Sequence, residues 1–164
     1  MDHCDECGFD YDLDTAADAG GAIVAGAAEI ATVLSDAADR AAGRRRPDTW
    51  SPLEYGCHVR DVLLVQRERV LLARREDRPS FAPMGRDERV DHDGYADQAP
   101  TDVARQLRDA AALFANVVDR LGPDWDRTVI YNYPQPLERS LRWVGVHTVH
   151  EVRHHLLDIR RQLA

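Results

Sequence analysis

Four long segments of this chain carry apolar residues at the three- and four-residue spacing of an amphipathic helix. Glycine or proline stands between them, and they cover about residues 15–42, 52–75, 101–121 and 137–163. The second segment has the clearest start, because Ser51 is a typical N-cap, Pro52 suits the first turn and Glu54 completes a capping box. The pattern predicts an all-α protein built as a four-helix bundle.

Two stretches fall outside these helices. Residues 79–98 are rich in proline and glycine, and their length indicates a crossover between helices or a lid over a site. Residues 128–133 alternate briefly as a strand does, but Pro134 and Pro136 are expected to end that stretch early. No convincing sheet is therefore predicted.

Charge and composition exclude several classes of function. The 164 residues suit one domain, and a net charge of −8 argues against nucleic-acid binding, which needs a clustered basic face. The 21 basic residues are all arginine, so Schiff-base chemistry and a Walker lysine are excluded. The start is acidic, unlike a signal peptide, and no run approaches the roughly 18 apolar residues of a membrane span. We expect a cytoplasmic protein without a membrane partner.

The last helical segment carries the pattern of a metal site. Four of the seven histidines stand close together near the C-terminus. At about 100° per residue, His147, His150 and His154 share one side of a helix with Glu151. His150 and His154, four residues apart, can hold one metal ion from successive turns. His155 lies nearer the apolar stripe and is expected to pack, although His147 or His155 would replace a ligand if the register differs.

The second helix offers one more histidine, His58, on the arc that should face the core. A lone histidine there usually packs, but together with the C-terminal pair it supplies three imidazoles, enough for a divalent ion with one position open. Asp61 and Asp158 are candidates to accept the second ring N–H of a ligand histidine. Asp61 and Glu151 are the candidate general bases.

The N-terminal segment, residues 1–13, differs from the domain predicted over residues 14–164 because it holds the motif Cys4-Asp-Glu-Cys7-Gly8. One CxxC is half of a zinc site, and the chain has no second one. Three readings stay open. The segment folds back and a thiolate fills the open metal position, or Cys4 and Cys7 hold a second zinc with another ligand, or the segment is a disordered tail with exposed thiols. The third cysteine, Cys57, is expected to be a buried small residue.

Two segments, WSPLEYGCHVRDV at residues 50–62 and HEVRHHLLD at residues 150–158, resemble the DinB-like superfamily. This group includes mycothiol-dependent maleylpyruvate isomerase and the bacillithiol and mycothiol S-transferases. The resemblance covers nearly the whole chain and implies a four-helix bundle with a long crossover. It also implies a divalent metal, zinc or nickel, on His58, His150 and His154, and many members dimerise. The N-terminal cysteine motif lies outside the common pattern.

Three functions follow. The first is a thiol-dependent transferase or isomerase, in which a metal lowers the pKa of a low-molecular-weight thiol such as mycothiol and the thiolate attacks an electrophilic substrate. The second is a metal-dependent hydrolase with Glu151 or Asp61 as general base. The third is a non-enzymatic metal- or redox-responsive protein that senses through Cys4 and Cys7.

Overall fold

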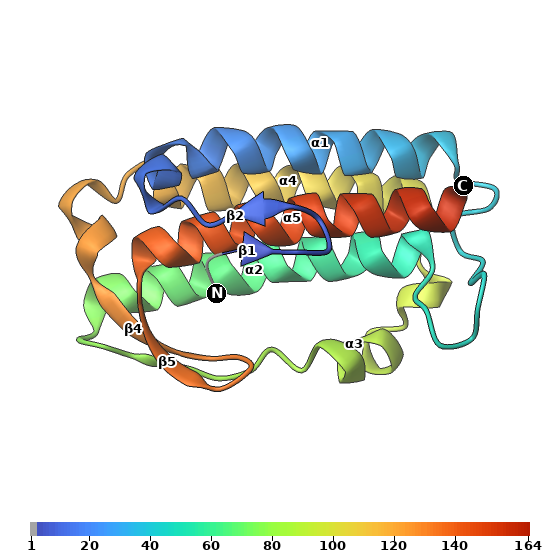
Figure 1. Ribbon diagram of the computed structural model, residues 1–164. Coiled ribbons are helices and arrows are strands. Elements are labelled where there is room, and N and C mark those ends of the chain that lie inside the picture. Colours follow the sequence, from blue (N-terminus) through green and yellow to red (C-terminus); the bar gives the residue numbers. More distant parts are fainter. Residues whose placement is uncertain (1–2) are drawn as a thin grey trace.

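The computed structural model describes residues 3–164, and four long helices dominate it (Figure 1). They are α1 (Ala19–Asp36), α2 (Pro52–Arg75), α4 (Pro100–Val118) and α5 (Leu141–Leu163). The predicted all-α four-helix bundle is confirmed. The short α3 (Arg86–His92) lies in the long connection between α2 and α4.

The order of the helices around the bundle explains that connection. α1 and α2 each pack against both α4 and α5, whereas they contact each other little, so they lie diagonally opposed. Figure 1 shows α2 and α4 running in the same direction, opposite to α1 and α5. Parallel neighbours need a connection that returns along the whole bundle, and residues 76–99 supply this crossover.

The core is made by apolar faces of all four helices. Ile23 and Ile30 of α1, Leu63 of α2 and Phe114 of α4 have fully buried side chains. The stretch Leu13–Asp36 is long and apolar enough for a membrane span by length and composition, a test that the core helix of a bundle also passes. In this structure its apolar side packs on α4 and α5.

Short strands correct the expectation of no sheet. β4 (Thr128–Asn132) and β5 (Pro136–Ser140) form an antiparallel hairpin, and β3 (Ser80–Phe81) in the crossover pairs parallel to β4. The predicted start of the last helix near residue 137 was therefore wrong. Residues 136–140 pair with β4, and the helix begins only after Ser140, whose side chain accepts a hydrogen bond from the N–H of Trp143.

Residues 3–13 of the N-terminal segment are folded, which overturns the interpretation of this part as a disordered tail. β1 (His3–Cys4) and β2 (Phe9–Asp10) form an antiparallel hairpin, and the 3₁₀ helix η1 (Leu13–Asp18) leads from it into α1. Figure 1 shows the hairpin in front of α5. Phe9 is buried, and its ring lies 5.4 Å from the ring of His150. The hairpin thus brings Cys4 and Cys7 to the histidine-bearing helix.

Candidate metal centre

α5 presents a continuous row of ligand-type side chains, and the fold divides it into two main groups. One group, here called the cross-bundle group, joins His58 of α2 to Glu151 and His155 of α5. The other, the hairpin group, has its ligand atoms within 4.8 Å of one another and consists of Cys4, Cys7, His150 and His154. Two smaller groups overlap these: His147 with His150 and Glu151, and His154 with His155 and Asp158.

The predicted set of His58, His150 and His154 is split between the two groups. Among residues 3–164, no group of ligand atoms joins His58 to His150 or His154. The reason is the rotation of α5 about its axis. Residues one position apart on a helix are turned by about 100°, and the side of α5 that faces α2 bears Glu151 and His155. That any of these groups binds metal stays a prediction.

His58 is positioned by the start of α2. The capping box is formed as predicted: the Ser51 hydroxyl accepts from the N–H of Glu54, and the Glu54 carboxylate accepts from the N–H of Ser51. The carboxylate also pairs with Arg44, at 2.6 Å. This fixed first turn places His58 one turn later, where its side chain is 2% exposed and its ring lies 5.2 Å from that of Trp50.

The imidazole of His58 is in the state that a cation requires. Burial, with a further contribution from the nearby His155, lowers the pKa of His58 to about 3, so the ring is neutral at pH 7. Its Nδ1 is buried and has no hydrogen-bond partner among residues 3–164. The other ring nitrogen, Nε2, lies 4.0 Å from Oε2 of Glu151, so it is the nitrogen that a cation beside this carboxylate would meet.

His155 is oriented by a carboxylate. Its Nδ1–H donates to Oδ2 of Asp158 over 3.0 Å, and its Nε2 lies 3.6 Å from Oε2 of Glu151. Burial opposes the charge of His155, but the hydrogen bond from its ring to Asp158 and the contact with Glu151 outweigh burial and raise its pKa to about 9. Asp158 thus accepts a ring N–H, as predicted from the sequence, but from His155, and it directs Nε2 toward the cross-bundle group. That this histidine is a metal ligand stays a prediction.

Glu151 faces both groups with one carboxylate. Its Oε2 lies 4.0 Å from Nε2 of His58, while its Oε1 lies 3.4 Å from Nδ1 of His150. Burial opposes the charge of Glu151, but the neighbouring imidazoles of His150 and His155 outweigh it and hold its pKa well below the usual range. Glu151 is therefore an anionic ligand candidate as well as the candidate general base.

The cross-bundle group fits a divalent cation. Two imidazoles and one glutamate are the protein ligands of a common type of catalytic zinc site, which keeps a fourth position for water or substrate. The neutral ring of His58, with Nε2 toward Glu151, and the carboxylate-oriented ring of His155 agree with such a site. Sequence reasoning assigned His155 to packing. The Glu151-x-x-x-His155 spacing, the same as that of His150 and His154, was the signal that could have found it.

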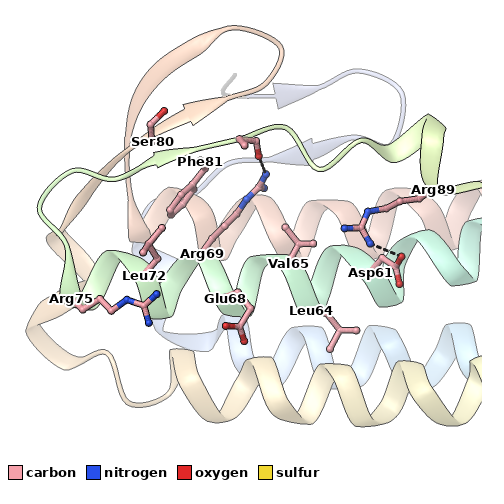
Figure 2. A pocket seen from close by; sticks show the side chains of 11 residues that line it. Asp61, Leu64, Val65, Glu68, Arg69, Leu72, Arg75, Ser80, Phe81 and Arg89 are labelled. Atoms are coloured by element: carbon pink, nitrogen blue, oxygen red, sulfur yellow. Dashed lines mark hydrogen bonds and ion pairs between the residues drawn. The ribbon is translucent and has the colours of Figure 1, made fainter. Parts of the chain in front are cut away.

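Asp61 lies outside this centre. Its carboxylate accepts hydrogen bonds from Arg60, Arg89 and Tyr95, at 2.7 to 3.0 Å, so its acceptor positions are used by these three donors. It borders a cavity of about 580 Å³ between α2 and the crossover, where Figure 2 shows it pointing toward Arg89. Within the described chain, the lining of this cavity does not include the cross-bundle residues. Among residues 3–164, no hydrogen bond or ion pair joins Asp61 to a histidine.

His147 is held by packing. Its ring stacks on Trp143, with centroids 4.5 Å apart, and its Nδ1 hydrogen-bonds with the Tyr11 hydroxyl at 3.0 Å. Burial lowers the pKa of His147 to about 4. The ring is thus a neutral part of an aromatic cluster beneath the N-terminal segment.

Comparison with known families agrees with this geometry. The family model described as the DinB superfamily matches residues 22–159. The chain belongs to the DinB superfamily. The match begins after the hairpin, so the Cys4 and Cys7 motif lies outside the shared region.

One solved structure is similar to this member of the superfamily. YfiT from Bacillus subtilis aligns with a TM-score of 0.68 and 14% sequence identity, over 88% of this chain and 87% of its own. That protein is described as "a probable metal-dependent hydrolase with an unusual four-helix bundle topology". At this identity the likeness shows the shared fold. Among curated proteins, no significant match is found.

Proposed function

We propose that this protein is a metal-dependent hydrolase whose cation is held by His58, Glu151 and His155. The observation that carries the proposal is the convergence of the buried His58 from α2 with an oriented histidine and a carboxylate from α5, both half-buried. Membership of the DinB superfamily and the description of YfiT support it.

A divalent cation in this place would supply Lewis acidity, which makes water a nucleophile at neutral pH. The other roles at the site belong to His58, Asp158 and Glu151. His58 is neutral without having to lose a proton, because burial has already lowered its pKa. Asp158 accepts the Nδ1–H of His155 and holds the ring in one orientation. Glu151 contributes the negative charge and, through the oxygen that faces His150, a second acceptor for protons.

Arg86 gives a reason to expect an anionic substrate. Its guanidinium lies 6.0 Å from the ring centroids of Trp50 and Tyr133, and Trp50 in turn contacts His58. About half of its side chain is exposed, so an incoming carboxylate or phosphate can reach it. We therefore propose a small anionic molecule as the substrate. We also propose the cytoplasm as the location, as expected from the sequence.

The thiol-dependent transferase or isomerase remains the second candidate because the resemblance to the superfamily implies it. The ligand set is the observation that ranks it below hydrolysis. A carboxylate ligand is a hard donor, found in zinc sites that act on water, whereas thiolates are bound best by softer sites. Nickel in place of zinc is compatible with the same ligands.

The test is a turnover assay with protein reloaded with zinc or nickel, using esters and amides of small acids, with and without mycothiol and an electrophile. We expect hydrolysis without added thiol, lost in His58→Ala and kept in His92→Ala, which removes an exposed histidine of α3. Turnover that requires mycothiol would make the protein a transferase. Turnover that His58→Ala leaves unchanged would contradict the assigned site.

A further inference from the structure

The hairpin group is not used by the proposed hydrolase, yet its atoms lie at ligand spacing. The Cys4 Sγ lies 3.7 Å from Nδ1 of His154. In a tetrahedral zinc site, with Zn–S of about 2.3 Å and Zn–N of about 2.0 Å, sulfur and nitrogen ligands are roughly 3.5 Å apart. The two atoms are thus placed as the edge of such a tetrahedron, and Cys7 and His150 supply the other two corners.

The turn of the hairpin places the two cysteines close together. Gly8 has a positive φ of 68°, and its N–H donates to the Cys4 carbonyl over 2.8 Å, which closes the turn directly after Cys7. Burial opposes ionisation of the Cys4 thiol, but the Cys7 N–H and the neighbouring His150 ring outweigh burial and lower its pKa to about 6.

The two histidines point to a ligand independently of the thiols. His150 is 7% exposed, and among residues 3–164 neither of its ring nitrogens forms an aligned hydrogen bond, although Nδ1 lies 3.4 Å from Oε1 of Glu151. His154 has Nδ1 toward Cys4, while its Nε2 lies 3.6 Å from carboxylate oxygens of Glu6 and Asp158. Carboxylates beside the outer nitrogen are the usual surroundings of a metal-bound histidine.

We propose that Cys4, Cys7, His150 and His154 bind a zinc ion in a structural site that fastens the N-terminal hairpin to α5. Two thiolates and two imidazoles form a closed set of four ligands, and the C-x₂-C and H-x₃-H spacings are typical of structural zinc. The soft sulfur donors favour zinc over magnesium or calcium. This site is separate from the cross-bundle group and does not depend on the proposed hydrolysis.

A redox-active dithiol is the competing explanation of the cysteine pair. Burial and the neighbouring Cys4 raise the pKa of Cys7, so one thiol is ionised more readily than the other, as in many redox motifs. The two imidazoles beside the sulfurs favour a metal, because a disulfide would use neither of them. The experiment must therefore report on the thiols as well as on the metal.

The test is cobalt exchange into the full-length protein, with total metal measured by elemental analysis. Thiolate ligands give tetrahedral cobalt a charge-transfer absorption in the near ultraviolet, and oxygen and nitrogen ligands alone do not. We expect this absorption in the wild type and in His58→Ala, and its loss in Cys4→Ser and His154→Ala. Cys57→Ala is the matched control, since it removes a buried cysteine whose thiol faces Tyr95 and Gln98 of the crossover, and it should keep the absorption.

Alkylation of the wild type covers the case in which a variant fails to fold. Zinc should protect Cys4 and Cys7 from a thiol reagent, and a chelator should expose them. Thiols that react equally fast with and without zinc, or a disulfide between Cys4 and Cys7 in the purified protein, would overturn the proposal. None of these readouts depends on activity, so failure of the hydrolase assay leaves the result unaffected.

Discussion

The cross-bundle group and the hairpin group use the same helix and the same four-residue spacing, but they differ in donors and in partners. Glu151 and His155 face α2, whereas His150 and His154, each one position earlier, face the N-terminal hairpin. The first group has three donors, one of them a carboxylate, and the second has four, two of them thiols. An offset of one residue, about 100° of rotation, therefore separates a catalytic type of site from a structural type.

The two groups also differ in what holds them in place. His58 stands on a long, capped helix inside a bundle, so its position needs no metal. The hairpin has two strands of only two residues each, and an isolated short hairpin is marginally stable in water. A cation in the cross-bundle group is thus expected to serve catalysis, and a cation in the hairpin group is expected to stabilise the hairpin.

The most direct test of this comparison is to remove each of two neighbouring histidines, one from each group, in a separate variant. His155→Ala should lower hydrolysis about 10³-fold or more, since Lewis acidity is worth several kcal/mol, and should keep the cobalt–thiolate absorption. His154→Ala should do the reverse. Steady-state kinetics and absorption spectra of both variants measure this. If each variant loses both properties, the two groups form one site.

Asp158→Asn weakens the hydrogen bond that orients the ring of His155, and it removes no proposed metal ligand. We expect the metal affinity of the cross-bundle group to fall about 10- to 100-fold, as for other carboxylates that orient a ligand histidine. Competition with a chromophoric chelator measures it. Asp126→Asn, which changes an exposed carboxylate paired with Arg142, is the control. An unchanged affinity in Asp158→Asn would mean that the hydrogen bond to His155 does not orient a ligand.

The metal affinity of the cross-bundle group should depend on pH, because protons compete with the cation for His155. Because the pKa of His155 is raised to about 9, a cation must displace its proton at neutral pH, and affinity should rise about tenfold per pH unit up to that value. Calorimetry on Cys4→Ser/Cys7→Ser, in which the cross-bundle group remains, measures the proton released. A flat affinity between pH 7 and 9 would show that His155 is not a ligand.

The smallest effect is expected at the start of α2, which only the cross-bundle group depends on. Glu54→Gln should lower the free energy of unfolding by about 1–3 kcal/mol, since it weakens buried charge-assisted hydrogen bonds. Burial opposes the charge of Glu54, but the Arg44 hydrogen bond outweighs it and lowers the pKa of Glu54 below 4.5. The stabilisation is therefore present above about pH 4.5 and is lost as the pH falls further.

Urea denaturation at neutral pH and near pH 3 measures this difference. The difference between the variant and the wild type should shrink as the pH falls, because the wild-type carboxylate then takes up a proton. The cobalt–thiolate absorption should be the same in both. A difference in stability that persists in acid would assign the effect of Glu54→Gln to packing and not to charge.

Local patterns predicted the helices well and the strands poorly. The start of α2 was predictable because Ser51, Pro52 and Glu54 act within one turn. The strand over residues 136–140 was taken for helix, because its pairing with residues 128–132 lies outside the pattern of either segment alone. Strands as short as His3–Cys4 have no periodicity to detect.

The sequence by itself determined the ligand types, their spacing along α5 and the helical frame that carries them. Only the tertiary structure decided that Glu151 and His155 of α5 meet His58, and not His150 and His154. It also decided that Cys4 and Cys7 lie against α5, from which they are separated by nearly the whole chain. The physical reason is that spacing depends on 3.6 residues per turn, a local property, whereas the rotation of a helix depends on what it packs against. Gly26 of α1 illustrates this, since a Cβ there would lie 2.6 Å from Cγ1 of Val152, the residue that follows Glu151.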